Sequence, residues 1–372
     1  MSVVPDRATA PPWPNEIDLL LACARREMRD TDVARARMAV ASGLDWDLVL
    51  RAAYAHGLTP LIHCHAAAGR VAVPAEVLGG LKRLSKRIAH RNLRLTAALV
   101  SVLRASAAAG LTMVPLKGPM LAERLYGSVA LRRILDVDLL VSPRDVATAT
   151  ALLESLGYHL VAAPGADSPH RAASHHVRLV SAGRSHVLEL HRYLLSPSGG
   201  RRIALDAIHP RLRSASVAGV PAPELAPEDL VVYLCLHGSA HGWTRLEWLA
   251  AVGELCRSGA VADWGLVWDT ARAWGGERRV RATLTLVRRL LDPDAPPIAG
   301  ADRWVDWATS GVSRRLGVPT DAGPRWRDLF VYNLLTDDSG RDRVRRCGMA
   351  LRYWSADAAQ RLRSRQYDRA RA

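Results

Sequence analysis

Two aspartates separated by one residue stand in an apolar stretch of the sequence. Asp136 and Asp138 lie within residues 134–141, whose other side chains are Ile, Leu and Val. Alternate side chains of a β-strand share a face, so both carboxylates would lie about 6.6 Å apart along one face, given a rise of ~3.3 Å per residue. Because neighbouring carboxylates repel each other, the pair predicts a bound divalent cation, Mg²⁺ or Mn²⁺, with oxygen ligands.

A second polar and apolar alternation follows about fifty residues later. Residues 186–191 place Glu189 and His191 on one face of a strand and two leucines on the other. If the two strands are neighbours, Glu189 becomes a third carboxylate and metal ligand beside Asp136 and Asp138. Two plainer alternatives stay open: the aspartates could be solvated on an exposed sheet face, although Asp is uncommon in strands, and His191 could simply pair with Glu189.

A phosphate-binding turn is predicted upstream of the acidic residues. Lys117 and Gly118 lie between a short apolar strand at 112–116 and a helix that Pro119 opens. Free backbone N–H groups, the helix dipole and the lysine ammonium together favour a phosphate. Carboxylates for metals beside a phosphate cradle are the layout required for phosphoryl or nucleotidyl transfer.

The elements that position these residues form an α/β (α+β) core between helical regions. Helical spacing of apolar residues predicts helices over 16–108, with Asp45 capping one of them, and again from 227 to the end. Clusters of Pro, Gly and Ser residues predict a linker and loops at 196–225. The predicted domains are a helical region at 1–109, a small mixed-sheet core at 110–195, the linker at 196–225 and a helical region at 226–372. Within the core we expect helices at 118–126 and 143–156, strands at 112–116, 134–141 and from 158, and a hairpin of 175–180 with 186–193.

The motifs of the core occur in an order that resembles the uncharacterised nucleotidyltransferase family of the polymerase β-like superfamily. The resemblance covers residues 110–195 and extends more loosely to the flanking helices, including residues 237–243. Members are commonly bacterial, and some are encoded near genes for peptide natural products such as lasso peptides. The residues that carry it are Lys117-Gly118, Tyr126-Gly127, Arg132, Asp136-Val137-Asp138, residues 152–158, His176 and Leu188-Glu189-Leu190-His191.

The resemblance implies a reaction and roles for its acidic residues. It implies transfer of a nucleoside monophosphate (NMP) group from a nucleoside triphosphate (NTP) to a hydroxyl or amine of an unknown small-molecule or peptide acceptor. Asp136 and Asp138 would hold two metal ions on the triphosphate. Glu189 would complete the metal site or help to deprotonate the acceptor.

It also implies residues that bind the nucleotide. Gly118 stands where the superfamily has its phosphate-loop glycine, and Lys117 is its neighbour. Arg132 and His176 would lie close to the nucleotide or the acceptor. His237 and His241, four residues apart, share a helix face and could contact substrate, bind a metal or pack structurally.

Composition leaves two alternatives to an enzyme open. The net charge of +15 would suit nucleic acid, but Lys82, Lys86 and Lys117 are the only lysines, and such arginine usage also fits a GC-rich coding bias. One alternative is a nucleic-acid-binding protein that uses the arginine-rich residues 341–372. The other is a scaffold that keeps the fold without activity. Of the two, nucleic-acid binding is the less favoured. The eleven tryptophans mostly have the spacing of core residues.

The cellular compartment is predicted from what the sequence lacks. The five cysteines never form a CxxC pair, which suits a reducing cytoplasm better than a disulfide framework or a zinc knuckle. No basic and then apolar segment opens the chain, and no apolar run is long enough to span a membrane. We therefore expect a cytoplasmic protein without a membrane partner.

Overall fold

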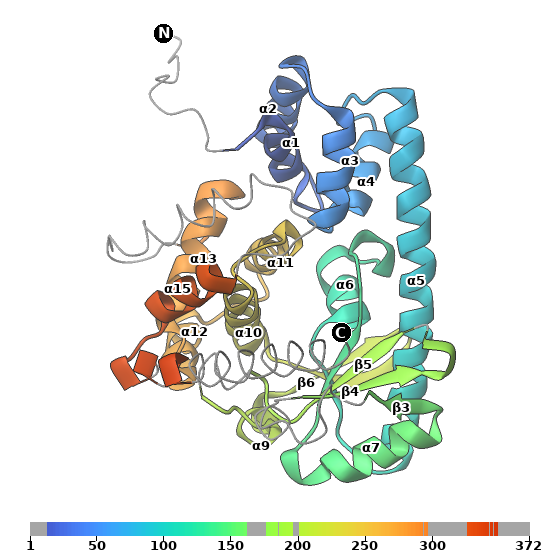
Figure 1. Cartoon of the computed structure of the whole chain (residues 1–372), viewed down its shortest axis with the longest axis vertical. Coiled ribbons are helices and arrows are strands. Elements are labelled where there is room, and N and C mark those ends of the chain that lie inside the picture. Colours follow the sequence, from blue (N-terminus) through green and yellow to red (C-terminus); the bar gives the residue numbers. More distant parts are fainter. Residues whose placement is uncertain are drawn as a thin grey trace, which may run out of the picture.

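The computed structural model describes residues 13–161, 176–184, 186–195, 201–292, 294–296, 326–341, 343–344 and 346–348. A long helix runs from the N-terminal helices, blue in Figure 1, to a small sheet, and the C-terminal helices, yellow to orange, lie beside both. The expectations for His175 and for most of residues 341–372 lie outside the described residues.

Five helices form the N-terminal part, as the apolar spacing predicts. The Asp45 carboxylate accepts a hydrogen bond from the Leu48 N–H at 2.9 Å, so it caps its helix as expected. The last helix ends two residues before Gly110, which has a φ of +67°. These helices are α1 (Asn15–Cys23), α2 (Asp30–Ala41), α3 (Trp46–Ala55), α4 (Thr59–Ala67) and α5 (Ala75–Ala108).

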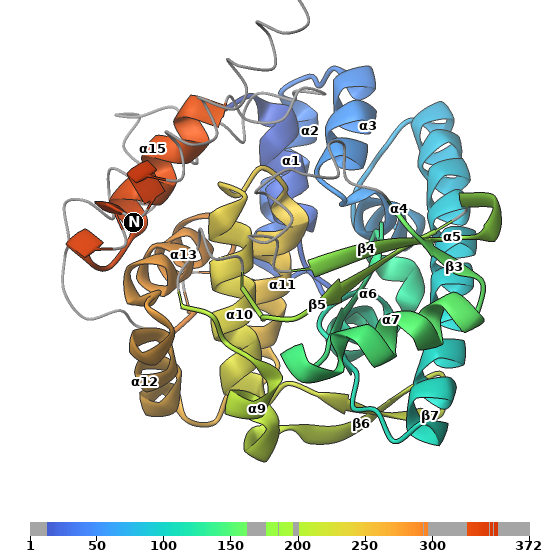
Figure 2. The same ribbon diagram turned by 60° about the horizontal axis from the view of Figure 1, so that its bottom comes forward.

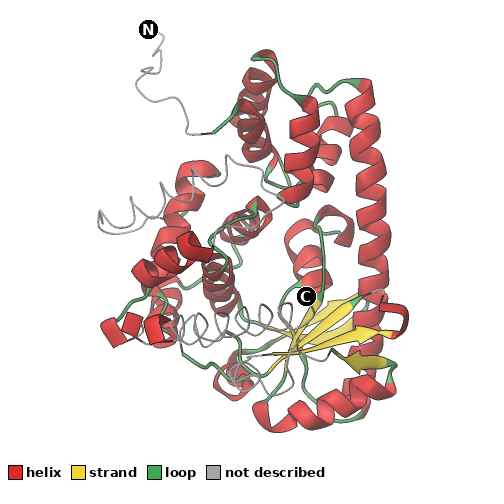
Figure 3. Ribbon diagram, viewed as in Figure 1, coloured by secondary structure: helices red, strands yellow, loops and turns green. Residues whose placement is uncertain are grey.

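The core is the predicted mixed sheet with helices between its strands, seen in yellow in Figure 3. The strand order is β1-β2-β5-β4-β3; β2 and β5 run parallel and the other neighbours antiparallel. The expected hairpin is therefore confirmed as β4 and β5. The strands are β1 (Val114–Pro115), β2 (Val137–Leu140), β3 (Tyr158–Leu160), β4 (His176–Ser181) and β5 (Val187–His191). The helical elements are α6 (Gly118–Tyr126), η1 (Val129–Leu131), η2 (Pro143–Asp145), α7 (Val146–Ser155) and η3 (Ala182–Arg184).

The strand that carries Asp138 is shorter than the sequence predicts. We expected it to span 134–141, but β2 begins at Val137, so Asp136 precedes the strand. The reason is that α5 side chains bind the backbone there: Asn92 accepts from the Ile134 N–H at 3.3 Å, and Arg91 donates to the Leu135 carbonyl at 2.8 Å. Because these side chains satisfy the backbone groups of Ile134 and Leu135, this part of the chain does not depend on strand pairing for its hydrogen bonds.

The two faces of the sheet differ in polarity as the alternation predicts. Val137 and Leu139 of β2, with Leu188 and Leu190 beside them on β5, belong to a hydrophobic cluster that also contains α5 and α7 residues such as Leu99. Asp138 and Glu189 occupy the other face. The packed helices thus fix the sheet and leave its polar face turned toward the rest of the protein.

Part of the expected linker is an ordered hairpin. Within 196–225, β6 (Arg213–Val217) and β7 (Val220–Glu224) pair antiparallel, after the short helices α9 (Leu205–Ile208) and η5 (His209–Arg211). The prediction of loops was wrong at 213–224, because Pro221 and Pro223 are typical of loops but here lie in a paired strand. They are tolerated in a two-stranded ribbon, whose outer edge needs no N–H donors.

Helices return after the hairpin, as predicted. One hydrophobic cluster contains residues of both the N-terminal and the C-terminal helices, for example Leu20 and Val252. Figure 2 shows the two groups side by side. No helix of the described ranges is both long and apolar enough to cross a bilayer. The C-terminal helices are α10 (Pro227–Ala240), α11 (Leu246–Arg257), α12 (Trp264–Trp274), α13 (Glu277–Leu290) and α15 (Trp326–Thr336).

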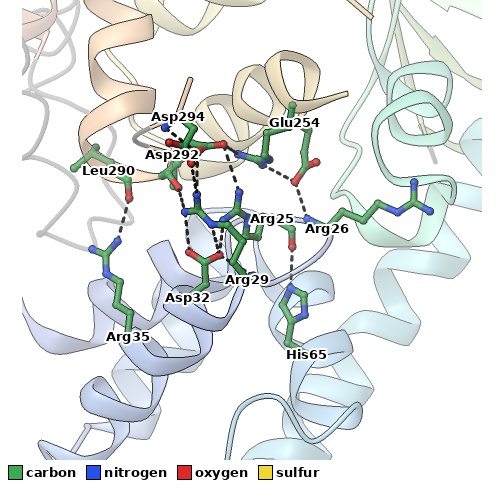
Figure 4. Close-up of polar contacts among 12 residues, drawn as sticks. Arg25, Arg26, Arg29, Asp32, Arg35, His65, Glu254, Leu290, Asp292 and Asp294 are labelled. Atoms are coloured by element: carbon green, nitrogen blue, oxygen red, sulfur yellow. Dashed lines mark hydrogen bonds and ion pairs between the residues drawn. The ribbon is translucent and has the colours of Figure 1, made fainter. Parts of the chain in front are cut away.

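A polar clamp of Arg25, Arg29, Asp32, Arg257 and Asp292 joins these two groups of helices. Figure 4 shows Arg25, Arg29, Asp32 and Asp292 pointing toward one another. Asp292, at the end of α13, lies 3.0 Å from Arg29 Nη1, 3.2 Å from Arg257 Nη1 and 3.5 Å from Arg25 Nη2. Asp32 of α2 pairs with Arg25 and with Arg29. The clamp thus ties the α1–α2 connection to α11 and α13 through one buried carboxylate.

Gly238 in α10 provides a first test of packing. A Cβ at this position would overlap the ring of the buried Trp243. We expect Gly238→Ala to destabilise the protein, because overpacking costs about 1–3 kcal/mol and outweighs the roughly 1 kcal/mol that alanine gains in helix propensity. Urea unfolding measures the effect. Gly79→Ala in α5 is the matched control: its Cβ would meet only the end of Arg83, at 3.5 Å, so stability should rise by about 0.5–1 kcal/mol. A gain in both variants would contradict the packing argument.

Candidate active site

Three side chains with metal-ligating atoms meet on the polar face of the sheet. Asp138 and Glu189 are register partners on the parallel strands β2 and β5, and His191 follows two residues after Glu189. One ligand atom of each lies within 4.8 Å of the others. Within the described part of the chain, Asp138, Glu189 and His191 are the His, Cys, Asp or Glu residues whose ligand atoms lie close enough together to hold a metal ion. It contains His191, and it does not contain Asp136.

Asp138 is the most buried of the acidic residues at this face, with 2% of its side chain exposed. Its Oδ2 lies 3.1 Å from Lys117 Nζ, and its Oδ1 lies 2.9 Å from His191 Nε2. Burial acts to raise the pKa of Asp138, but the Lys117 ammonium and the His191 hydrogen bond outweigh it and hold the pKa well below its usual range. Asp138 is therefore ionised.

Asp136 lies just before β2 and is only partly buried. Burial and the Asp138 carboxylate raise its pKa, while Lys117 and Arg132 oppose that rise. Asp136 stands two residues before Asp138 in the chain, and the charges of Asp138 and Arg132 both act on its carboxylate. Arg132 is itself buried, and its Nε has no hydrogen-bond partner among the described residues. An unpaired buried guanidinium nitrogen next to carboxylates is consistent with a site made for an anionic ligand and a cation together.

Glu189 is the accessible carboxylate of the converging group, with 21% of its side chain exposed. It lies 3.8 Å from His191 Nε2 and 3.9 Å each from His176 Nε2 and Arg178 Nε. Burial and the neighbouring Asp138 raise its pKa. His176 occupies the register position opposite His191, with ring centroids 5.3 Å apart, and burial lowers its pKa to about 4. Glu189 and His176 therefore line the solvent side of the site.

The turn predicted to bind phosphate leads directly to this group. Leu116 N–H donates to the Asp138 carbonyl at 3.0 Å, which holds the end of β1 against β2. Gly118 has a φ of +70°, which favours glycine, and a Cβ there would lie 3.6 Å from the Asp136 carbonyl oxygen. Helix α6 begins directly after Lys117, and no side chain of the described residues caps its first turn. The turn thus brings Lys117 and a helix N-terminus to the acidic residues.

His237 of α10 reaches the site from the C-terminal helices. Its Nε2 lies 3.3 Å from Lys117 Nζ. Burial and the Lys117 ammonium hold its pKa well below the usual range, so the neutral ring accepts the hydrogen bond through Nε2. The His237 ring lies 4.8 Å from His241 and 5.8 Å from Trp248, centroid to centroid. Of the uses left open for the two histidines, the geometry favours contact with the site over a separate metal site for His237.

The structure therefore brings together most of the residues predicted from sequence. Asp138 contacts Lys117 directly, and Glu189 lies in one group with Asp138 and His191. The charge of Arg132 acts on Asp136, which stands two residues before Asp138. Gly118 follows Lys117 in the turn, and His176 lies 3.9 Å from Glu189. The sequence left open that His191 pairs with Glu189; the two lie 3.8 Å apart, and Asp138 is a closer partner of His191 at 2.9 Å. Its place two residues after Glu189 was the signal for its role. Nothing in the sequence places His237 next to Lys117, because the two residues lie on elements more than a hundred positions apart.

Comparison with known proteins gives one family. No curated protein is significantly similar to the chain. The model of a family described as "Uncharacterised nucleotidyltransferase" matches residues 42–292, more than half of the chain, and includes every residue of the site described above. The chain therefore belongs to this uncharacterised nucleotidyltransferase family, which supports nucleotidyl transfer as its general activity.

Proposed function

We propose that the protein transfers an NMP group from an NTP to a hydroxyl or amine of a small-molecule or peptide acceptor, with Mg²⁺ or Mn²⁺ bound. The observation that carries the proposal is the convergence of Asp138 and Glu189, with Asp136 beside them, next to the Lys117-Gly118 turn. Family membership supports the general class of reaction. We place the activity in the cytoplasm, because NTPs are abundant there and because the cysteine pattern suits a reducing compartment.

The donor atoms fit hard divalent cations. Carboxylate oxygens of Asp136, Asp138 and Glu189 would hold the metal, and such ligands suit Mg²⁺ and Mn²⁺. His191 is hydrogen-bonded to Asp138, so it orients that carboxylate as a supporting partner. When bound, the metal would neutralise negative charge that develops on the phosphoryl oxygens.

The chain's own residues supply binding and proton transfer. Lys117 and the N-terminus of α6 would bind the triphosphate, and Arg132 and His176 would lie along the nucleotide or the acceptor. The acceptor oxygen or nitrogen forms a bond to the α-phosphorus, the bond from that phosphorus to pyrophosphate breaks, and pyrophosphate leaves. Glu189, which is accessible to solvent, would take the acceptor's proton or complete the metal site.

Incubation of the protein with each of the four NTPs, Mg²⁺ and acceptor extracts tests the proposal. We expect mass spectrometry to find an acceptor, or the protein itself, heavier by one NMP, and to find no product when EDTA replaces Mg²⁺. Peptides belong among the acceptors. A thermal shift that requires both Mg²⁺ and an NTP should accompany binding. If no NTP shifts the melting temperature with Mg²⁺ or Mn²⁺ present, a scaffold that only keeps the fold is the better description.

A further inference from the structure

The buried carboxylate of the site already has a cation. Lys117 Nζ lies 3.1 Å from Asp138 Oδ2, and His191 engages the other oxygen. Both partners of the ion pair are shielded from water, with 2% of the Asp138 side chain and 12% of the Lys117 side chain exposed. Glu189, in contrast, keeps its carboxylate accessible. An approaching divalent cation therefore reaches the exposed carboxylate of Glu189 first. The buried carboxylate of Asp138 is already paired with the Lys117 ammonium.

The lysine is held at this place by its surroundings. Its ammonium donates to Nε2 of the neutral His237, which packs against Tyr233 and Trp248. Gly118 follows directly, with a φ of +70°, at the start of α6. Lys117 thus stands between Asp138 and the turn that would bind a triphosphate, and its ammonium is within reach of either.

We propose that Lys117 is an exchangeable counter-ion, which neutralises Asp138 in the metal-free protein and gives up Oδ2 to the entering divalent cation. The inference rests on the proposed function. An ammonium and a divalent cation repel each other, so they do not share one carboxylate oxygen at short range. The released ammonium turns to the nearest remaining anion, the triphosphate.

This exchange couples the two ligands. Metal alone must displace Lys117 without any new partner for the ammonium, so it binds weakly. When a nucleotide is present, the displaced ammonium binds phosphate, and the metal binds more tightly. Because coupling between two ligands is reciprocal, the metal strengthens nucleotide binding by the same factor. The site then discriminates against metal without nucleotide.

The first test measures Mn²⁺ binding by electron paramagnetic resonance, with no catalysis involved. Lys117→Met in the full chain should bind Mn²⁺ about tenfold more tightly than the wild type, a factor within the usual range of coupling. A non-hydrolysable NTP analogue should strengthen Mn²⁺ binding to the wild type by a clearly larger factor than to Lys117→Met, in which only direct coordination of the metal by the triphosphate remains. Lys86→Met, at an exposed position of α5, should behave as the wild type.

Equal or weaker Mn²⁺ binding by Lys117→Met, with binding lost in Asp138→Asn, would overturn the exchange and leave the proposed function intact. If neither the wild type nor Lys117→Met bound Mn²⁺, with or without the analogue, the proposed function itself would fail. The two failures are therefore distinguishable.

A second test leaves Lys117 unchanged and is simple because Lys82, Lys86 and Lys117 are the only lysines of the chain. In protein labelled with ¹³Cε and ¹⁵Nζ lysine, each side chain gives its own nuclear magnetic resonance signal, assigned with Lys82→Arg and Lys86→Arg. We expect Mg²⁺ to shift the Lys117 signal alone and the nucleotide analogue to shift it again. A Lys117 signal that does not move at a Mg²⁺ concentration shown by calorimetry to saturate the protein would refute the exchange.

Discussion

Replacing Asp136 by asparagine is expected to lower the rate of NMP transfer by about a thousandfold or more while the protein stays folded. The side chain keeps its shape and loses the charge that would hold the metal; loss of one electrostatic contact to the transition state typically costs factors of 10²–10³ or more. Stability should be retained, because Asp136 lies outside β2 and is only partly buried. Its pKa is raised by burial and by Asp138, so removing its charge also relieves repulsion.

The measurement is release of pyrophosphate or incorporation of labelled NMP, with circular dichroism and thermal melting to confirm the fold. Asp145→Asn is the matched control. Asp145 ends η2, is 37% exposed and has Arg144 at 3.8 Å, so this variant should keep both activity and stability. Wild-type turnover in Asp136→Asn would remove Asp136 from the metal ligands and leave Asp138, Glu189 and His191 as the site's only converging group.

The polar face of the sheet was predictable because it depends on local alternation. The alternation of polar and apolar residues in 134–141 and 186–191 places Asp138 on the polar face of its strand, and Glu189 and His191 on the polar face of theirs. This holds whatever the order of the strands in the sheet. The parallel pairing of β2 with β5 then aligns Asp138 with Glu189. The Lys117-Gly118 turn was predictable for the same reason, since a strand, a glycine and a helix start follow one another in sequence.

The parts that sequence did not predict depend on contacts between distant segments. The start of β2 is set by Asn92 and Arg91 of α5, which take backbone groups that a longer strand would have used. The contact of His237 with Lys117 requires α10 to pack against the core. The hairpin at 213–224 contains Pro221 and Pro223, which read as loop signals until their strand is known to lie at an edge.

The hydrophobic contacts between the helical regions also join distant segments, so the sequence does not predict them. Apolar spacing predicts the helices at both ends of the chain, and it cannot reveal that Leu20 and Val252 belong to one cluster. The two helical regions share that cluster, while α5 and α7 share another with the sheet. The active-site turn is therefore held by α6 between the two clusters, with Met120 in one and Leu121 in the other.

Loss of the central carboxylate of the polar clamp should have the largest effect on stability. Asp292 is 5% exposed and lies among Arg25, Arg29 and Arg257 (Figure 4). Asp292→Asn keeps the shape and leaves three guanidinium groups facing a neutral amide. Removing one partner of a buried ion pair costs about 3–5 kcal/mol when the remaining charge is left without a partner. Here Asp32 still pairs with Arg25 and Arg29, and Glu254 with Arg257, so the lower end of that range applies. We expect a loss of this size in the free energy of unfolding, measured by urea titration.

Asp294→Asn is the matched control, since the same substitution is made two residues away. The Asp294 side chain is 89% exposed, and its carboxylate makes a long contact of 3.6 Å with Arg29 Nη1, so water already screens its charge. Exposed ion pairs contribute about 0–1 kcal/mol, and this variant should unfold almost as the wild type does. Similar unfolding free energies for the two variants would mean that Asp292 does not hold the helical regions together. A loss confined to Asp292→Asn would show that the buried carboxylate of the clamp stabilises the contact between the two helical regions.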